Sequence, residues 1–207
     1  MLTTLNPDML ILARESRGFS QSELAKTIGV SQGKLSKAEK GEQSLVEEIF
    51  KKICKILNYP EKFFLQPTPT APVSHYYYRK RVTIPQKVIM QMEATIKIFR
   101  RNIDSLIDSV ELPEFKLNFP ESSTRNPEEL ARMVRHKFGV LKGPIGNLTS
   151  LLENNGIVIV KTDLFNDKID GLSTISEKGA HVIFLNARMP NDRQRFSLAH
   201  ELGHMLM

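Results

Sequence analysis

The segment His200-Glu201-Leu202-Gly203-His204 holds two histidines four residues apart, with a glutamate next to the first. On a helix, positions i and i+4 lie on one face, so both imidazoles can reach a single Zn²⁺ at about 2.0–2.1 Å. Glu201 lies beside them, where it can take a proton from an activated water and pass it to a leaving amine. The segment therefore predicts a zinc site with His200 and His204 as ligands and Glu201 as the catalytic base. A chance match of five residues, or two core histidines bonded to carbonyls, is the alternative.

Several short elements precede this motif. Strands are predicted near residues 157–160, 172–175 and 181–185, which are rich in β-branched and other apolar residues. The motif helix follows Pro190 and is expected to be capped by Asn191 or Asp192, with apolar residues on much of its remaining circumference. Helices are also predicted from Asn126 to Gly139 and from about 145 to 154. We expect a small, mostly antiparallel sheet whose edge strand can hold an extended peptide across the zinc site.

The middle of the chain contains a linker and a long helix. Three prolines within residues 67–72 predict an extended linker. Apolar residues then recur every three or four positions from Val88 to Val110, which predicts a long helix between Pro85 and Pro113. Its apolar stripe is expected to pack onto the domain behind it, and a dimerising coiled coil is the alternative.

The first 66 residues predict only helices, at about 7–16, 21–28, 32–39 and 45–57, with a final turn near 61–65. Apolar residues at Leu24, Ala25 and Ile28, followed by Gly29, have the spacing of a helix-turn-helix. The second helix of that motif carries polar and basic groups suited to base edges and phosphates in a major groove. The predicted DNA contacts on it are Ser31, Gln32, Lys34 and Lys37. A protein-binding helical bundle is the alternative.

These elements together predict an α+β fold in three parts. Residues 1–66 form an all-α helix-turn-helix bundle, and residues 67–78 form a Pro-rich linker. Residues 79–207 form a mixed domain with a long helix, a small, mostly antiparallel sheet and an active-site helix.

Charge and composition favour some classes of function and exclude others. The net charge of +6 is concentrated in residues 67–101, which hold 7 Lys or Arg against 1 Asp or Glu. This favours a polyanionic partner, although a solvated helix face explains it equally well. No apolar run approaches the roughly 20 residues of a membrane span and no signal peptide opens the chain, so we expect a cytoplasmic protein without membrane contact. The single cysteine, Cys54, excludes an internal disulfide, so any metal must use histidine or carboxylate.

Two resemblances extend these interpretations. The N-terminal segment resembles the Cro/XRE-type repressor domain through Arg14, residues 20–25, Gly29-Val30-Ser31 and Glu39-Lys40-Gly41. The resemblance implies that Gln21 clamps a phosphate of a double-stranded DNA operator and that Arg14 pairs with Glu39. The C-terminal part resembles the ImmA/IrrE family of zinc metallopeptidases through the motif and residues 126–131, 143–148, 152–157, 170–173 and 192–199.

The sequence differs from the ImmA/IrrE family in one respect. Members of that family take a third zinc ligand, a carboxylate, from a helix downstream of the motif, whereas this sequence stops three residues after His204. We therefore expect a domain truncated just after the motif, with Zn²⁺ bound weakly or not at all. Exposed Leu202 and Leu206 would then favour a homodimer or aggregation. Substitute ligands are available, but each is expected to be a surface or core residue: His136, His181, Asp163, Asp167 and Asp170.

Two functional hypotheses follow. The first is a DNA-binding transcriptional regulator fused to a zinc-dependent endopeptidase that cleaves a repressor-type protein in stress or mobile-element regulation, as the resemblance implies. The second is a non-catalytic DNA-binding regulator, or an antitoxin-like protein, with an incomplete, vestigial metallopeptidase domain.

Overall fold

The computed structural model describes residues 5–68, 84–117 and 126–207. These residues divide into two compact units, the first made of residues 5–68 and 84–99 and the second of residues 100–117 and 126–207. Most of the predicted linker, together with Arg79, Lys80 and Arg81, lies outside the described residues. The predicted domain boundaries at 66 and 78 therefore stay a prediction. Within the described ranges, no helix is both long and apolar enough to cross a bilayer.

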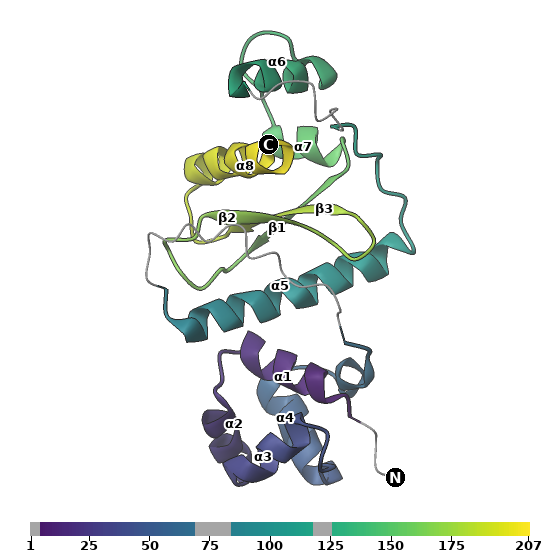
Figure 1. The fold of residues 1–207 in the computed structure, drawn as a ribbon, viewed down its shortest axis with the longest axis vertical. Coiled ribbons are helices and arrows are strands. Elements are labelled where there is room, and N and C mark those ends of the chain that lie inside the picture. The colour runs from purple at the N-terminus through teal and green to yellow at the C-terminus, as the bar shows by residue number, and fades with distance from the viewer. Residues whose placement is uncertain (1–4, 69–83, 118–125) are drawn as a thin grey trace. The chain divides into compact units, whose positions relative to one another are not determined.

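The first unit is helical, as predicted (Figure 1). It contains α1 (Pro7–Ser16), α2 (Gln21–Ile28), α3 (Gln32–Glu39), α4 (Glu47–Leu57) and the short 3₁₀ helix η1 (Glu61–Leu65). Their apolar faces meet in one core, formed by Leu10, Ala13, Leu24, Ala25, Ile28, Leu35, Ala38, Phe50, Ile53, Leu57 and Phe64.

Local sequence signals explain the turn between α2 and α3. Ser20 and Glu23 form a reciprocal capping box that fixes the start of α2. Gly29 ends α2 with a φ of 76°, a left-handed conformation that glycine adopts without steric cost. Ala25 is almost fully buried, which allows the two helices to approach closely. The predicted helix-turn-helix geometry is confirmed.

The long helix α5 (Gln86–Ile107) begins directly after Pro85, as predicted, but ends six residues before Pro113. Its first half belongs to the first unit, where Ala94 packs against Met9 and Leu12 of α1. The Nζ atom of Lys87 lies 2.9 Å from the carboxylate of Glu23. Part of the apolar stripe thus packs against α1 of the first unit.

The second unit is built around a three-stranded sheet. It contains α6 (Pro127–Lys137), α7 (Leu148–Glu153), β1 (Ile157–Thr162), β2 (Gly171–Ile175), β3 (His181–Asn186) and α8 (Asn191–Leu206). The strand order is β1-β3-β2, with β2 antiparallel and β1 parallel to β3. The α+β class is confirmed, but the expectation of a mostly antiparallel sheet is wrong. The short turn at residues 176–180 makes β2 and β3 a hairpin, and β1 joins the free side of β3 in parallel.

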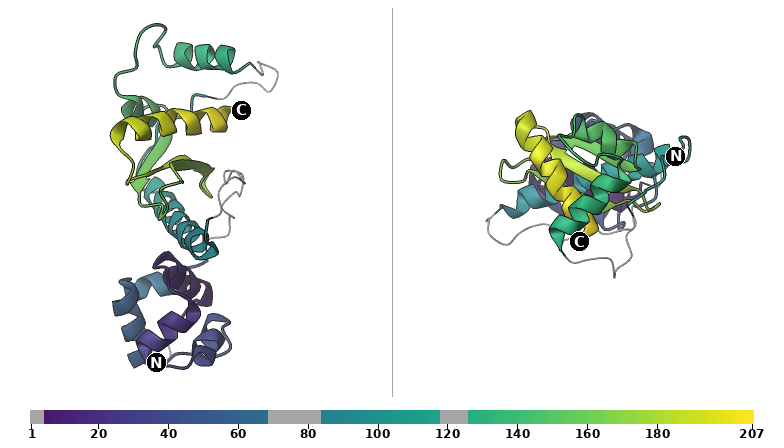
Figure 2. Two further views of the ribbon diagram at one scale, coloured as in Figure 1. Left: turned by 90° about the vertical axis from the view of Figure 1, so that its left-hand side faces the viewer. Right: turned by 90° about the horizontal axis from the view of Figure 1, so that it is seen from above.

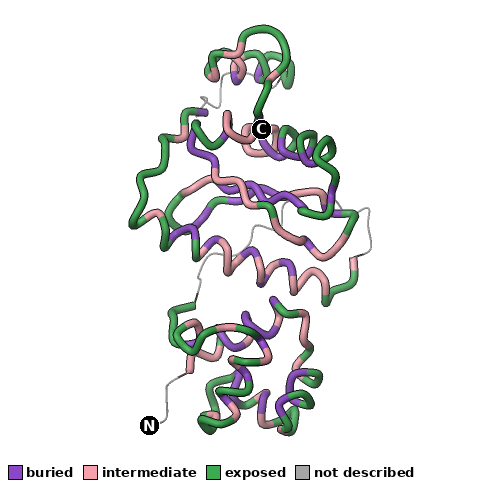
Figure 3. Tube along the Cα trace, turned by 180° about the vertical axis from the view of Figure 1, so that it is seen from behind, coloured by how far each residue is buried: buried purple, intermediate pink, exposed green. Residues whose placement is uncertain are grey.

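Helix α8 lies along one face of this sheet, as two perpendicular views show (Figures 1 and 2). Ile183 and Leu185 of β3 pack against Leu198 and Leu202 of α8. The burial colouring shows the sheet and the inner face of α8 as mostly buried (Figure 3). The predicted active-site helix therefore has a rigid support.

The hairpin of β2 and β3 is anchored at its turn by the last part of α5. The carboxylate of Asp104 is buried and accepts hydrogen bonds from the backbone N–H groups of Glu177 and Lys178, both at 3.1 Å. At the other end of β3, the buried amide of Asn186 donates to the carbonyls of Asn166 and Ile169. Both ends of β2 are thus held by buried polar groups, which fixes its position beneath α8.

Candidate functional site

Helix α8 carries the predicted zinc motif on its last turns. It begins at Asn191 with Pro190 in the cap position and no side-chain cap, so the predicted capping by Asn191 or Asp192 is wrong. The helix buries only the face turned toward the sheet, and Phe196 is 72% exposed, because the sheet covers a single side. Leu202 lies on the covered side and is 9% exposed, so its expected exposure is also wrong.

The two histidines converge on one point. The Nε2 atoms of His200 and His204 lie 3.0 Å apart, and their rings meet edge to face at 4.5 Å. Two nitrogens at adjacent corners of a tetrahedral zinc site would be about 3.3 Å apart, given Zn–N bonds of about 2.0–2.1 Å. The pair therefore fits two ligand positions of a zinc ion. The exposed ring of Phe196 lies nearly parallel to that of His200, with 6.3 Å between centroids.

No described residue brings a third ligand to this pair. Among the residues that the structure describes, no group of three or more His, Cys, Asp or Glu could hold a metal ion. The candidate substitutes are engaged elsewhere. Asp163 and Asp167 pair with Arg188, while Asp170 pairs with Arg193 at 2.8 Å.

The two histidines among those substitutes also lie apart from the motif. His181 stacks on Phe115 at the start of β3, with 3.7 Å between ring centroids. His136 is exposed on α6.

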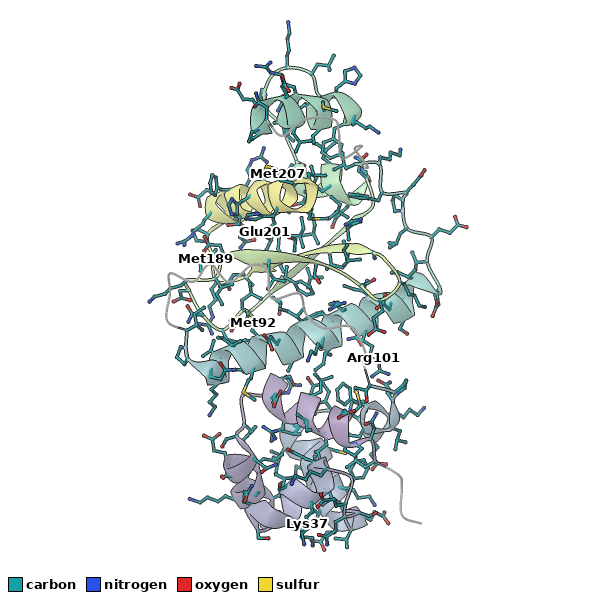
Figure 4. All side chains as sticks on the ribbon, viewed as in Figure 1. Lys37, Met92, Arg101, Met189, Glu201 and Met207 are labelled. Atoms are coloured by element: carbon teal, nitrogen blue, oxygen red, sulfur yellow. The ribbon has the colours of Figure 1, made fainter. Side chains whose placement is uncertain are left out.

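Glu201 lies between α8 and the sheet (Figure 4) and is 6% exposed. Its Oε2 accepts a hydrogen bond of 3.1 Å from Oγ of Ser173 on β2. Burial raises the pKa of the Glu201 carboxyl, and this effect outweighs the lowering by hydrogen bonds from Ser173 and by the charges of His204 and His200. A raised pKa makes a carboxylate a stronger base, which suits the role of proton acceptor.

The sequence did not identify two residues that contact Glu201. Gly171 and Ser173 lie on the same face of β2, since side chains alternate along a strand. One sequence pattern could have predicted this contact, namely two small residues at alternate positions of a strand before the motif helix. Such residues leave room for a polar side chain from the helix. The sequence showed them only as part of a family resemblance.

The predicted DNA contacts cluster at the start of α2 and along α3. Gln32 and Lys37 are exposed, and Figure 4 shows Lys37 on the outer side of α3. Ser31 is the N-cap of α3, where its hydroxyl accepts the N–H of Lys34. Gln21 opens α2, and its side-chain oxygen accepts a hydrogen bond from Nε2 of Gln32. The fold thus brings these residues together, while their contact with DNA stays a prediction.

A buried ion pair between Arg14 and Glu39 supports this cluster. The guanidinium of Arg14 donates to both carboxylate oxygens of Glu39, at 2.6 and 3.0 Å, and to the carbonyl of Phe19 at 2.9 Å. Nε2 of Gln21 donates to the same carboxylate at 2.8 Å. The pairing of Arg14 with Glu39 is confirmed, and it sets the orientation of the Gln21 side chain.

Each unit contains a region that matches a family of known proteins. A helix-turn-helix family model matches residues 10–64, and a model of the IrrE N-terminal-like domain of peptidase family M78 matches residues 152–207. The chain thus contains a helix-turn-helix domain and, in the same polypeptide, an IrrE N-terminal-like peptidase-family domain. No curated protein and no solved structure matches the chain.

The helix-turn-helix domain contains every predicted DNA contact and most of α1. The IrrE N-terminal-like domain, as matched, runs from the end of α7 through the sheet to α8. It includes His200, Glu201 and His204 together with Ser173 of β2. The candidate zinc pair and the buried carboxylate therefore lie inside the region that carries the peptidase-family resemblance.

Proposed function

We propose that this chain is a DNA-binding transcriptional regulator whose IrrE N-terminal-like domain is a zinc-dependent endopeptidase. The observation that carries the proposal is the convergence of the His200 and His204 Nε2 atoms, 3.0 Å apart, beside the buried carboxylate of Glu201. A pair of histidines and an acid at this spacing is the arrangement that metal-assisted peptide hydrolysis uses.

The residues of the chain have distinct parts in this chemistry. His200 and His204 would hold the metal, which when bound supplies Lewis acidity and lowers the pKa of water to about 7. Glu201 would accept the proton of the attacking water and return it to the leaving amine. Strand β2 lies at one edge of the sheet next to α8, where an extended peptide could add to it by main-chain hydrogen bonds.

A repressor-type protein is the substrate that we propose. The helix-turn-helix domain would bring the peptidase domain to an operator, where repressors are bound, in stress or mobile-element regulation. A homodimer would match the two half-sites that such domains commonly occupy.

Zinc titration tests the metal site. We expect weak binding of one Zn²⁺ per chain, with affinity reduced at least about tenfold in His200→Ala and in His204→Ala, since even outer-sphere changes cost 10–100-fold. Isothermal titration calorimetry measures both quantities. The control is His136→Ala, which removes an exposed histidine of α6. Equal zinc affinity in the wild type and both motif variants would exclude this site.

A second candidate is a non-catalytic regulator whose peptidase-family domain binds a partner. The observation that favours it is that the described residues supply only two of the three protein ligands of a catalytic zinc site. Operator binding by a chain that neither binds zinc nor cleaves any repressor would select this candidate.

The DNA interface predicts a defined salt effect. Replacing Lys37, an exposed residue of α3, by alanine is expected to weaken binding to an operator selected from a random duplex pool and to lower the salt slope by about 1. Fluorescence anisotropy at several salt concentrations measures both. The matched control is Lys52→Ala on α4, whose side chain pairs with Glu48. An identical loss in both variants would point to net charge and contradict a specific role for Lys37.

A further inference from the structure

The face of β2 beneath α8 is shaped around Glu201. Gly171 and Ser173 occupy alternate positions of the strand, opposite Leu185 and Ile183 of β3. A Cβ atom at Gly171 would lie 2.8 Å from the carbonyl oxygen of Phe184 and 3.5 Å from Cγ of Glu201. Only glycine therefore fits at this point without moving the backbone of β3, whereas the distance to Glu201 is that of an ordinary van der Waals contact.

Ser173 supplies the polar partner on the same face. Its side chain is 2% exposed, and its surroundings on β3 and α8 are largely aliphatic. A hydroxyl buried in such surroundings is costly unless it is hydrogen-bonded. Its single O–H donates to Oε2 of Glu201 at 3.1 Å, so the buried hydroxyl has a partner and one carboxylate oxygen accepts a hydrogen bond.

We propose that Ser173 is a positioning residue, which holds Oε2 of Glu201 and thereby fixes the orientation of the carboxylate beside the two histidines. The inference rests on the proposed function, in which Glu201 is the base. The terminal torsion of a glutamate is broad, so an unbonded carboxylate would sample many orientations. A catalytic group must be held within about 0.5 Å and 10–20° of its productive geometry, and a hydrogen bond from a strand residue helps to hold it there.

The test uses the full chain without metal. The side-chain carboxyl carbons of glutamate are labelled with ¹³C, and the signal of Glu201 is assigned by its loss in Glu201→Gln. We expect Ser173→Ala to shift or broaden this signal and Ser173→Thr, which keeps a hydroxyl on a β-branched side chain suited to a strand, to restore it. The matched control is Ser197→Ala, since this buried serine lies one turn before Glu201 and its hydroxyl donates to the carbonyl of Arg193.

A second measurement determines the catalytic rate of the variants. In cleavage of a repressor-type protein, Ser173→Ala is expected to lower kcat about tenfold, with KM and zinc affinity unchanged. This loss is smaller than the 10²–10⁴-fold rate enhancement that a general base contributes, because Glu201 itself is still present. A Glu201 signal unmoved in Ser173→Ala, or moved equally in Ser197→Ala, would overturn the positioning role. A chain that binds no zinc would instead overturn the proposed function. The carboxyl signal, which is measured without metal, would still test whether Ser173 orients Glu201, so failure of the function and failure of the positioning role are distinguishable.

Discussion

Replacing Glu201 by glutamine is expected to reduce peptide cleavage by about 10²–10⁴-fold while zinc affinity stays unchanged. Glutamine keeps the size of glutamate, and its side-chain oxygen can still accept the hydrogen bond from Ser173, so the packing of α8 on the sheet is preserved. An amide cannot take up the proton of the attacking water. The loss should therefore fall on the chemical step alone.

Incubation with candidate repressor-type proteins, followed by mass spectrometry of new termini, measures this effect. Zinc affinity is measured in parallel by calorimetry. The control is Glu153→Gln, which neutralises an exposed glutamate at the end of α7. Cleavage by Glu201→Gln at the wild-type rate would exclude Glu201 as the base even if the histidines bind zinc.

Local signals explain why the helical part of the fold could be predicted. The capping pair Ser20 and Glu23 and the left-handed Gly29 fix the boundaries of α2 within a few residues of sequence. The apolar stripe of α5 was a weaker guide. Leu106 in the last turn of α5 is 62% exposed, and Val110 beyond its end is 56% exposed, so the end of the stripe lacks a covering surface within the described chain.

The sheet could not be predicted to the same extent because strand order is a non-local property. Composition identified all three strands, but the parallel pairing of β1 with β3 joins residues 24 positions apart, from Ile157 to His181. The same distinction applies to the site. The spacing of His200 and His204 on one helix predicted their convergence, whereas Ser173 reaches Glu201 from 28 residues away. No periodicity within α8 could reveal that contact.

Replacing Glu39 by alanine is expected to destabilise the helix-turn-helix domain by about 3–5 kcal/mol, the cost of leaving a buried charge without its partner. The side chains of Arg14 and Glu39 are only 9% and 4% exposed, and two hydrogen bonds join them. Loss of the carboxylate would leave the guanidinium with the Phe19 carbonyl and the partly exposed Glu15 as partners. It would also release Nε2 of Gln21, so operator binding should weaken as well.

Hydrogen exchange of the core amides of Leu10, Leu24 and Leu35 measures this loss within the domain itself, because it reports local unfolding free energies. Glu47→Ala is the matched control. Glu47 pairs with Lys51 on the surface of α4, where solvent screens the charges, so exchange should be unchanged.

The double variant Arg14→Met with Glu39→Leu separates two possible causes of the lost stability, which are the unpaired charge and the lost packing. If the unpaired charge is responsible, the double variant loses less stability than Glu39→Ala alone, since both charges are then removed from the core. A double variant that is less stable than Glu39→Ala would show instead that the packing and hydrogen-bond geometry of the pair, and not its charge balance, hold the domain together.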